Sequence, residues 1–255
     1  MAKPAKQFTR VAKYYDLLMR EVPYEYWADY VEQIIARERA EVYDGLDLAC
    51  GTGSVGLALE RRGYRMVGAD VSEAMVRVAA QRARECGARF PVVVCDAQRL
   101  CFRPAFDFVV SLFDSLNYIT TDEGLARTFR GVARALRPRG LFIFDLNTIR
   151  ALKLNLFTQS NFSPHSPLKY KWESRYDEKN RLCTVVMHFW YECDGKREEF
   201  TEVHYQRGYT LEEIRCWLWD AGLELVRAYD GYTFRRPSRW TNRVFCVARK
   251  RRGIL

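Results

Sequence analysis

The sequence DLACGTGSVG at residues 47–56 limits the possible folds more than any other stretch of the chain. Gly51, Gly53 and Gly56 follow a short apolar run and precede an alternation of apolar and charged residues. Glycine costs conformational entropy wherever it stands, so glycines clustered between a strand and a helix indicate a sharp turn or the close approach of a ligand. The stretch predicts a strand, a turn and a helix, with a merely tight turn as the alternative to a ligand site.

Short apolar runs alternate with amphipathic helical patterns along the first 150 residues. Two helical patterns come first, at residues 8–19 and 27–35, and Ser72 predicts the N-cap of a later helix. Seven strands are predicted at residues 45–49, 65–69, 90–95, 106–111, 141–144, 224–228 and 243–248. Strands that alternate with helices form a parallel sheet covered on both faces. The predicted fold class is α/β, with a seven-stranded, doubly wound, Rossmann-like and mostly parallel sheet.

The alternation is interrupted by three long strand-like runs at residues 168–176, 181–193 and 196–207. Asp194-Gly195 joins the last two and is a strong hairpin signal. We therefore expect an antiparallel β-meander inserted after the fifth strand. The expected domains are a main domain of residues 1–150 and 208–255, and a lid or substrate subdomain of residues 151–207.

Composition and charge exclude several classes of protein. No apolar run approaches the ~18 residues of a membrane span, and the N-terminus lacks the apolar core of a signal peptide, so we expect a cytosolic protein without membrane contact. The eight cysteines include no Cys-x-x-Cys pair, so we expect no metal site. The net charge of +9 comes from basic ends, residues 1–13 and 231–255. Solvated tails explain such ends more often than nucleic-acid binding does, although RNA stays an alternative partner.

The glycine pattern also matches the sites that bind adenosine-containing cofactors. Gly51, Gly53 and Gly56 are followed by Asp70 at the end of the next predicted strand, the place of a carboxylate that binds a ribose diol. The glycines admit the ligand, and the amides at the helix N-terminus face it. The pattern by itself leaves NAD and other nucleoside cofactors open.

The stretch DLACGTG resembles the first motif of the class I S-adenosylmethionine-dependent methyltransferases. Later stretches are similar to further motifs of that family: GADVSEAM, VCDAQRL, FDFVVSLFDSLNY and ARALRPRGLFIFDLN. The opening helices, the meander and the C-terminal stretch resemble the bacterial YqeM-type small-molecule methyltransferases, which are similar to sugar N,N-dimethyltransferases. The resemblance covers residues 8–250. It implies S-adenosyl-L-methionine as cofactor and methyl transfer to N or O of a small molecule.

The resemblance also implies a role for each matching residue. Asp70 would bind the ribose, Asp96 and Ala97 the adenine, and the backbone of residues 49–53 the methionine part, although the family commonly has glycine where Ala49 stands. Tyr15 and Trp27 would close over the cofactor, with a place in the core as the alternative. The implied cofactor-binding set is Tyr15, Trp27, Ala49, Cys50, Gly51, Gly53, Asp70, Val71, Met75, Asp96, Ala97 and Leu112.

The acceptor pocket is expected between the loop after the fourth strand and the meander. The loop offers Asp114, Asn117 and Tyr118, and the meander side offers Trp172, His204, Arg207 and Tyr209. Methyl transfer from a sulfonium needs mainly alignment, and it needs a base only where the acceptor holds a proton. The candidate catalytic residues are Tyr118, His204 and Arg207, with His204 as a base and Arg207 gripping an anionic group of the acceptor.

Three other functions stay open from the sequence. An RNA methyltransferase would use the basic ends, an NAD-dependent oxidoreductase would use the same glycines, and a protein that binds S-adenosylmethionine without catalysis would share the cofactor site. The expected assembly is a monomer or a homodimer.

Overall fold

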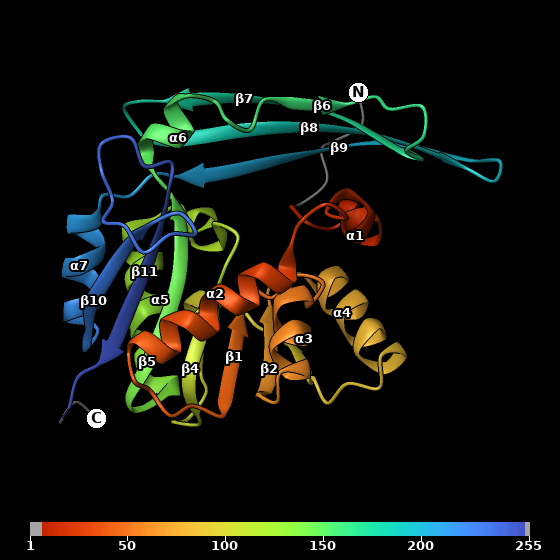
Figure 1. Cartoon of the computed structure of the whole chain (residues 1–255). Coiled ribbons are helices and arrows are strands. Elements are labelled where there is room, and N and C mark those ends of the chain that lie inside the picture. Colours follow the sequence, from red (N-terminus) through yellow and green to blue (C-terminus); the bar gives the residue numbers. More distant parts are fainter. Residues whose placement is uncertain (1–6, 253–255) are drawn as a thin grey trace.

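The computed structural model of the chain describes residues 7–252. Its main layer is a seven-stranded sheet in the order β10-β11-β5-β4-β1-β2-β3 (Figure 1). The strands are β1 (Asp44–Leu48), β2 (Arg65–Asp70), β3 (Val92–Val94), β4 (Phe106–Ser111), β5 (Leu136–Asn147), β10 (Leu223–Asp230) and β11 (Arg243–Lys250). The first five are parallel, and β11 runs antiparallel between β5 and β10. The predicted fold class is confirmed.

Helices cover both faces of this sheet, because successive side chains of a strand point to opposite faces. Phe108 and Val110 of β4 pack with α2 and α3, whereas Val109 packs with α5 and α7 on the other face. The helices are α2 (Tyr24–Arg37), α3 (Ser54–Arg61), α4 (Glu73–Glu85), α5 (Asp122–Ala135) and α7 (Leu211–Asp220). Burial on both faces explains the apolar runs within these strands, such as residues 108–110 of β4 and 141–144 of β5. Within residues 7–252, no helix is long and apolar enough to cross a membrane.

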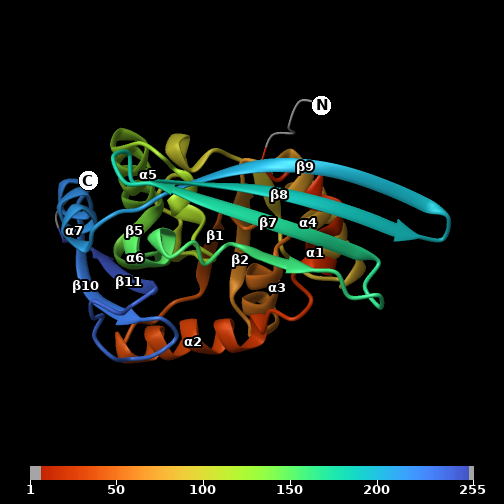
Figure 2. The same cartoon turned by 90° about the horizontal axis from the view of Figure 1, so that it is seen from above.

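A second, antiparallel sheet of four strands lies across the carboxyl ends of the parallel strands (Figures 1 and 2). Its strands are β6 (Gln159–Asn161), β7 (Leu168–Asp177), β8 (Leu182–Cys193) and β9 (Lys196–Arg207), and α6 (Ile149–Lys153) precedes them. The predicted meander corresponds to β7, β8 and β9. The sequence analysis missed β6, because three polar residues show neither alternation nor strand propensity.

The N-terminal segment packs against this second sheet. Residues 8–19, predicted as one helix, form only two short turns, η1 (Val11–Tyr14) and α1 (Tyr15–Leu18). Tyr14 stacks on Phe200 of β9 with ring centroids 5.8 Å apart. The carbonyl oxygen of Phe8 accepts a hydrogen bond from Ser72 Oγ at 2.7 Å. The segment therefore bridges the two sheets.

Two predicted boundaries, the start of α4 and the start of β5, can be compared with the structure. Ser72 is the N-cap of α4 as predicted, and its side chain accepts from the amide of Met75 at 3.3 Å. β5 begins five residues earlier than predicted, at Leu136, and its register with β4 shifts near the start. The intervening Pro138 lacks an amide donor, and Arg139 adopts a left-handed φ of 67°, so this stretch is irregular before regular pairing resumes at Leu141.

Gly56 lies where α3 passes over the ring of Phe90. A β-carbon at Gly56 would meet two ring atoms of Phe90 at 2.4 Å, and Asp47 Oδ2 at 3.1 Å. The amide of Gly56 donates to that same Asp47 oxygen at 2.9 Å. The glycine is therefore required for close packing of helix on strand.

We expect Gly56→Ala to lower the free energy of unfolding by about 1–3 kcal/mol, the usual cost of overpacking, although alanine favours a helix. Phe90→Leu should cost less in the Gly56→Ala background than in the wild type, because the smaller side chain leaves room for the added methyl group. Urea denaturation of the four proteins measures this coupling. Equal costs of Phe90→Leu in both backgrounds would show that the ring is not the obstacle.

Candidate functional site

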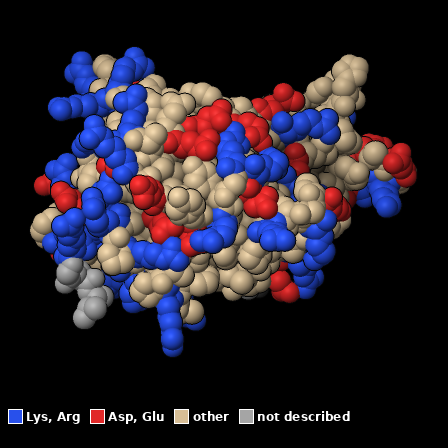
Figure 3. Space-filling model, turned by 60° about the horizontal axis from the view of Figure 1, so that its bottom comes forward, with Lys and Arg blue, Asp and Glu red and all other residues tan. Residues whose placement is uncertain are grey.

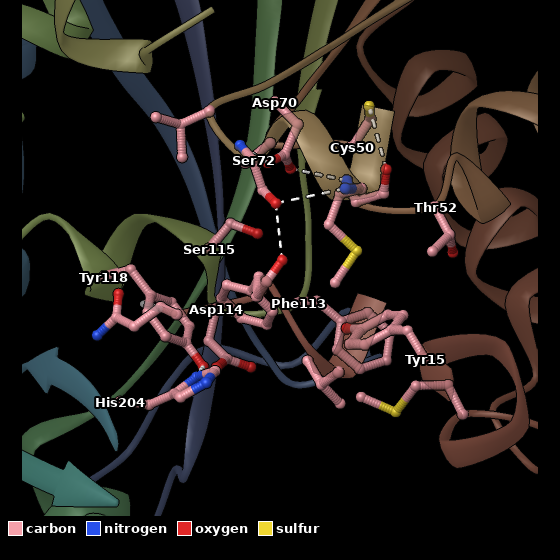
Figure 4. A pocket seen from close by; sticks show the side chains of 18 of the residues that line it. Tyr15, Cys50, Thr52, Asp70, Ser72, Phe113, Asp114, Ser115, Tyr118 and His204 are labelled. Carbon is pink, nitrogen blue, oxygen red and sulfur yellow. Dashed lines mark hydrogen bonds between the residues drawn. The ribbon is translucent and has the colours of Figure 1, made fainter. Parts of the chain in front are cut away.

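A cavity of about 1480 Å³ lies between the carboxyl ends of β1, β2 and β4 and the second sheet (Figure 4). β1 stands between β2 and β4, so the cavity opens at the point where the strand order reverses, the usual ligand site of an open α/β sheet. The predicted residues that line it are Tyr15, Ala49, Cys50, Gly51, Asp70, Val71, Met75, Asp96, Ala97, Leu112, Asp114, Tyr118, Trp172 and His204.

The glycine-rich turn after β1 supplies one end of the cavity. Ala49, Gly51 and Gly53 all adopt left-handed φ angles, of 60°, 54° and 80°. This conformation favours glycine, which gives a physical reason for the glycine that the family commonly has at the place of Ala49. A β-carbon at Gly51 would meet nothing within 4 Å, whereas one at Gly53 would meet the Phe90 ring at 2.8 Å. Gly51 thus keeps the backbone open to a ligand, and Gly53 lies behind the cavity wall as the N-cap of α3.

Asp70 connects this turn to the next one. Its carboxylate accepts from the amide of Gly51 at 2.9 Å and from the amide of Ser72 at 2.8 Å. Burial raises the pKa of Asp70, and these two amides oppose the rise. The carboxylate is therefore held in place at the end of β2 while it faces the cavity (Figure 4).

Asp47 is a second buried acidic residue at this end of the cavity. We call this end, formed by Asp47, Asp70 and the glycine turn, the floor. Burial raises the pKa of Asp47 to about 7, opposed by its hydrogen bond from Gly56. In the described part of the chain, neither Asp47 nor Asp70 forms an ion pair with a basic side chain. Buried carboxylates without a cation are costly, so this floor fits a ligand that carries positive charge. S-adenosylmethionine carries a sulfonium and an ammonium group, and these residues fit it.

The remaining predicted cofactor residues differ in their surroundings. Val71 is 67% exposed and Met75 is 1% exposed, yet both border the cavity. The side chain of Asp96 accepts from the amide of Gln98 at 2.9 Å and caps η2 (Ala97–Arg99). Asp96 therefore combines a place at the cavity with a local capping role.

Trp27 does not reach the cavity. Its ring lies 4.0 Å from the ring of Phe113 and 4.9 Å from that of Tyr232, within the core beneath α2. Phe113 lines the cavity in front of it. The prediction that Trp27 contacts the cofactor is replaced by the alternative of a core residue, because the apolar stripe of α2 faces the sheet.

The loop after β4 forms the opposite wall and is strained. Phe113 and Asp114 adopt left-handed φ angles of 67° and 48°, a conformation that costs a non-glycine residue about 1–3 kcal/mol. Asp114 is held by Arg243 at 2.7 Å and by Gln206 Nε2 at 2.5 Å. Arg243 also pairs with the fully buried Asp145, whose Oδ2 accepts from the amide of Asp114 at 3.1 Å. This buried network offsets the strain and positions η3 (Ser115–Tyr118).

Three polar side chains share the buried face of β9, and one of them, His204, lines the cavity. Glu202, His204 and Gln206 alternate along the strand and are at most 1% exposed. His204 Nδ1 lies 3.3 Å from Tyr118 Oη, so the structure brings these two predicted residues together. The sequence analysis missed Glu202 and Gln206. The sequence pattern that could have identified them is the alternation that places these polar residues on the same strand face as the apolar Phe200.

Arg207, Tyr209 and Asn117 lie outside the cavity. Arg207 pairs with Asp122 of α5 at 2.7 Å and donates to the carbonyl oxygen of Thr120 at 3.2 Å. Tyr209 donates to the carbonyl oxygen of Ile119. Asn117 donates to the carbonyl oxygen of Arg207 at 2.8 Å. The prediction that Arg207 grips the acceptor is corrected, because Arg207 does not line the cavity and its guanidinium joins α5 and the residue Thr120 to the end of β9.

Comparisons with known proteins agree with this geometry. Residues 46–140 match the family model of a methyltransferase domain. The chain is 30% identical over 249 residues to YqeM of Bacillus subtilis (strain 168), a protein named as a methyltransferase, with 96% of this chain and 97% of the relative covered. An S-adenosylmethionine-dependent methyltransferase of Clostridium acetobutylicum ATCC 824 is 26% identical and superposes with a TM-score of 0.84, covering 95% of this chain and 98% of that chain.

A third relative carries the name of an amino-sugar enzyme. The dTDP-4-amino-2,3,4,6-tetradeoxy-D-glucose N,N-dimethyltransferase of Saccharopolyspora spinosa is 24% identical over 193 residues, with 76% of both chains covered.

The raised pKa of Asp47 predicts a pH-dependent stability. Between the ordinary pKa of 3.8 and the folded value of about 7, the folded state holds a proton that the unfolded state has lost. The free energy of unfolding therefore falls as the pH rises through this range, by on the order of a few kcal/mol. Asp47→Asn keeps an oxygen for Gly56 and removes the titration. We expect the variant to match the wild type near pH 4 and to exceed its stability at pH 8. A stability difference that is the same at both pH values in urea denaturation would contradict this.

Proposed function

Because the chain belongs to the YqeM-like class I S-adenosylmethionine-dependent methyltransferases, we propose that it transfers the methyl group to a nitrogen or oxygen of a small-molecule acceptor. Membership of this family replaces the oxidoreductase alternative. The proposal concerns the acceptor, the residues that bind it and the residues that bind the cofactor.

The size and closure of the cavity support this proposal most strongly. Pockets for single small ligands measure ~300–1,000 Å³, and this cavity measures about 1480 Å³. It runs from the glycine turn to His204 and is covered by the second sheet and the N-terminal segment. Such a space accommodates the cofactor and a second small molecule side by side.

Asp70 and the glycine turn form the proposed cofactor end. When bound there, S-adenosylmethionine supplies a methyl group on a sulfonium, which is a good leaving group. Asp70 would accept from the ribose hydroxyls, residues 96 and 97 would border the adenine, and Asp47 with the backbone of residues 49–51 would face the charged methionine part. The chain itself then has to align the acceptor and exclude water.

The opposite end offers polar groups to an acceptor. Tyr118 and His204 lie there, together with Trp172 of β7. Within residues 7–252 the indole N–H of Trp172 is buried and has no hydrogen-bond partner, so an acceptor oxygen or nitrogen that reached it would complete its hydrogen bonding. The name of the Saccharopolyspora spinosa relative refers to the amino group of a sugar, which supports an amine on a polar small molecule.

The distribution of basic residues argues against RNA as the acceptor. Lys3 and Lys6 lie outside the described residues, and Arg10 and Lys13 both pair with Glu198. Within the basic C-terminal end, residues 231–255, Arg243 is held by Asp114 and Asp145, and Arg249 pairs with Glu38 at 3.0 Å at the edge of the sheet opposite the cavity. Figure 3 shows Lys and Arg near this end of the chain interspersed with acidic residues.

We expect Asp70→Ala to raise the dissociation constant for S-adenosylmethionine ten- to a hundredfold, because charge-assisted hydrogen bonds contribute ~1.5–3 kcal/mol. Isothermal titration calorimetry measures the change. Asp177→Ala, on an exposed turn of the second sheet, is the matched control and should bind like the wild type. An unchanged constant for Asp70→Ala would remove this residue from the cofactor site.

Transfer of label from methyl-labelled S-adenosylmethionine tests the acceptor class. The purified protein is incubated with separated small-molecule, RNA and protein fractions of a cell extract. We expect label in the small-molecule fraction, and its loss with Asp70→Ala at low cofactor concentration. Label found in RNA and released by ribonuclease would overturn the choice of acceptor.

A further inference from the structure

Glu202 and His204 place two ionisable groups on the buried face of β9, next to the polar Gln206. Their side chains are 0% and 1% exposed, and their neighbours on this face include Phe200. Burial of a charge is costly unless several hydrogen bonds compensate it. The hydrogen bonds that compensate this burial determine where the protons of the pair lie.

The carboxylate of Glu202 accepts an unusual number of hydrogen bonds. The amides of Phe8, Arg10 and Val11 donate to it at 2.9, 2.7 and 3.0 Å, and His204 Nε2 lies 2.9 Å from Oε2. Burial raises the pKa of Glu202, but the contacts with His204 and with these amides outweigh burial and lower it. Glu202 is therefore ionised and has no proton to donate.

An ionised Glu202 determines the tautomer of His204. A carboxylate accepts only, so Nε2 of His204 must carry the proton between them. In the neutral ring Nδ1 is then an acceptor, and Tyr118 Oη, 3.3 Å away, is its donor. The hydroxyl of Tyr118 donates to the histidine and also interacts with the side chain of Gln206, which leaves one oxygen lone pair for an acceptor group at the cavity, where Figure 4 shows Tyr118 and His204.

We propose that Tyr118, His204 and Glu202 form a proton relay that removes a proton from the acceptor group as it is methylated. This proposal rests on the function proposed above and narrows it to acceptors with an amine N–H or a hydroxyl. The acceptor lone pair forms the new bond to carbon, the carbon–sulfur bond breaks, and its electron pair stays on sulfur. The acceptor's proton passes to Tyr118 Oη while the tyrosine proton passes to His204 Nδ1. The resulting imidazolium is stabilised by Glu202.

The surroundings favour a relay over a phenolate base. Burial, and then the charge of Asp114, raise the pKa of Tyr118, so its phenolate is not populated near neutral pH. Within residues 7–252, further ionisable groups that face this pair are Glu202, Cys183 of β8 and Tyr15 of α1, and Arg243 forms ion pairs with both Asp114 and Asp145. Phe8 packs edge-on against His204 with centroids 4.6 Å apart and shields it from water. Tyr118 is thus the proposed catalytic residue, and His204 and Glu202 are positioning residues that act through it.

Nitrogen-15 NMR of histidine-labelled protein tests the tautomer without any acceptor. The chain has three histidines, so a His204→Gln spectrum assigns the signal. At pH 7.5 we expect a protonated Nε2 and an unprotonated Nδ1. Tyr118→Phe should preserve this tautomer, and Glu202→Gln should lose the preference. A ring protonated at Nδ1, or at both nitrogens, at pH 7.5 would overturn the relay.

The turnover rates of Tyr118 and His204 variants test the proton transfer itself. With whichever extract fraction takes up label, Tyr118→Phe should lower kcat ~10²–10⁴-fold, the usual contribution of acid–base catalysis. The variant should keep the wild-type dissociation constant for S-adenosylmethionine, whereas Tyr43→Phe, at an exposed site remote from the cavity, should keep the wild-type rate. His204→Gln should lower kcat by a similar factor, because Tyr118 then lacks the ring nitrogen that takes its proton. Wild-type kcat in Tyr118→Phe would overturn the relay even if the acceptor is small, and label in RNA would overturn only the choice of acceptor.

Discussion

The ion pairs of Arg243 with Asp114 and Asp145 join three parts of the chain around the candidate site. Arg243 comes from β11, Asp145 from β5 and Asp114 from the loop after β4, and Gln206 joins the second sheet to the same carboxylate. Charges in a low-dielectric interior attract strongly, and removal of one partner leaves the others uncompensated at a cost of ~3–5 kcal/mol. The left-handed residues of the loop, and with them the place of Tyr118, depend on this network.

The buried carboxylates near the two ends of the cavity have pKa shifts of opposite direction. On the floor, Asp47 and Asp70 are buried with few donors, so burial raises their pKa values. On the roof, Glu202 is buried among many donors, and its pKa is lowered. A floor that lacks a cation reduces the stability of the protein alone and prepares it for a positively charged ligand. On the roof, the carboxylate of Glu202 lies 2.9 Å from Nε2 of His204 and fixes the orientation of that ring.

The sequence analysis located the glycine turn and the residues near it because turn geometry is a local property. Left-handed φ angles at Gly51 and Gly53 and the capping by Ser72 depend on neighbours a few residues away. The prediction for Trp27 failed because an aromatic residue at helical spacing has the same pattern in a core and in a ligand site. The role predicted for Arg207 was wrong because its ion-pair partner, Asp122, is distant in sequence. The residues around Asp122 do not indicate this pairing.

The sequence by itself determined the alternation of strands and helices, the inserted hairpins and the carboxylate at the end of β2, since each follows from periodicity or turn chemistry over a few residues. Tertiary structure alone decided which polar side chains meet across the cavity. Tyr118 and His204 are 86 positions apart, and Glu202 contacts amides more than 190 positions away. Such contacts form only when the second sheet packs over the first, because burial and hydrogen bonding then select the partners that water would otherwise separate.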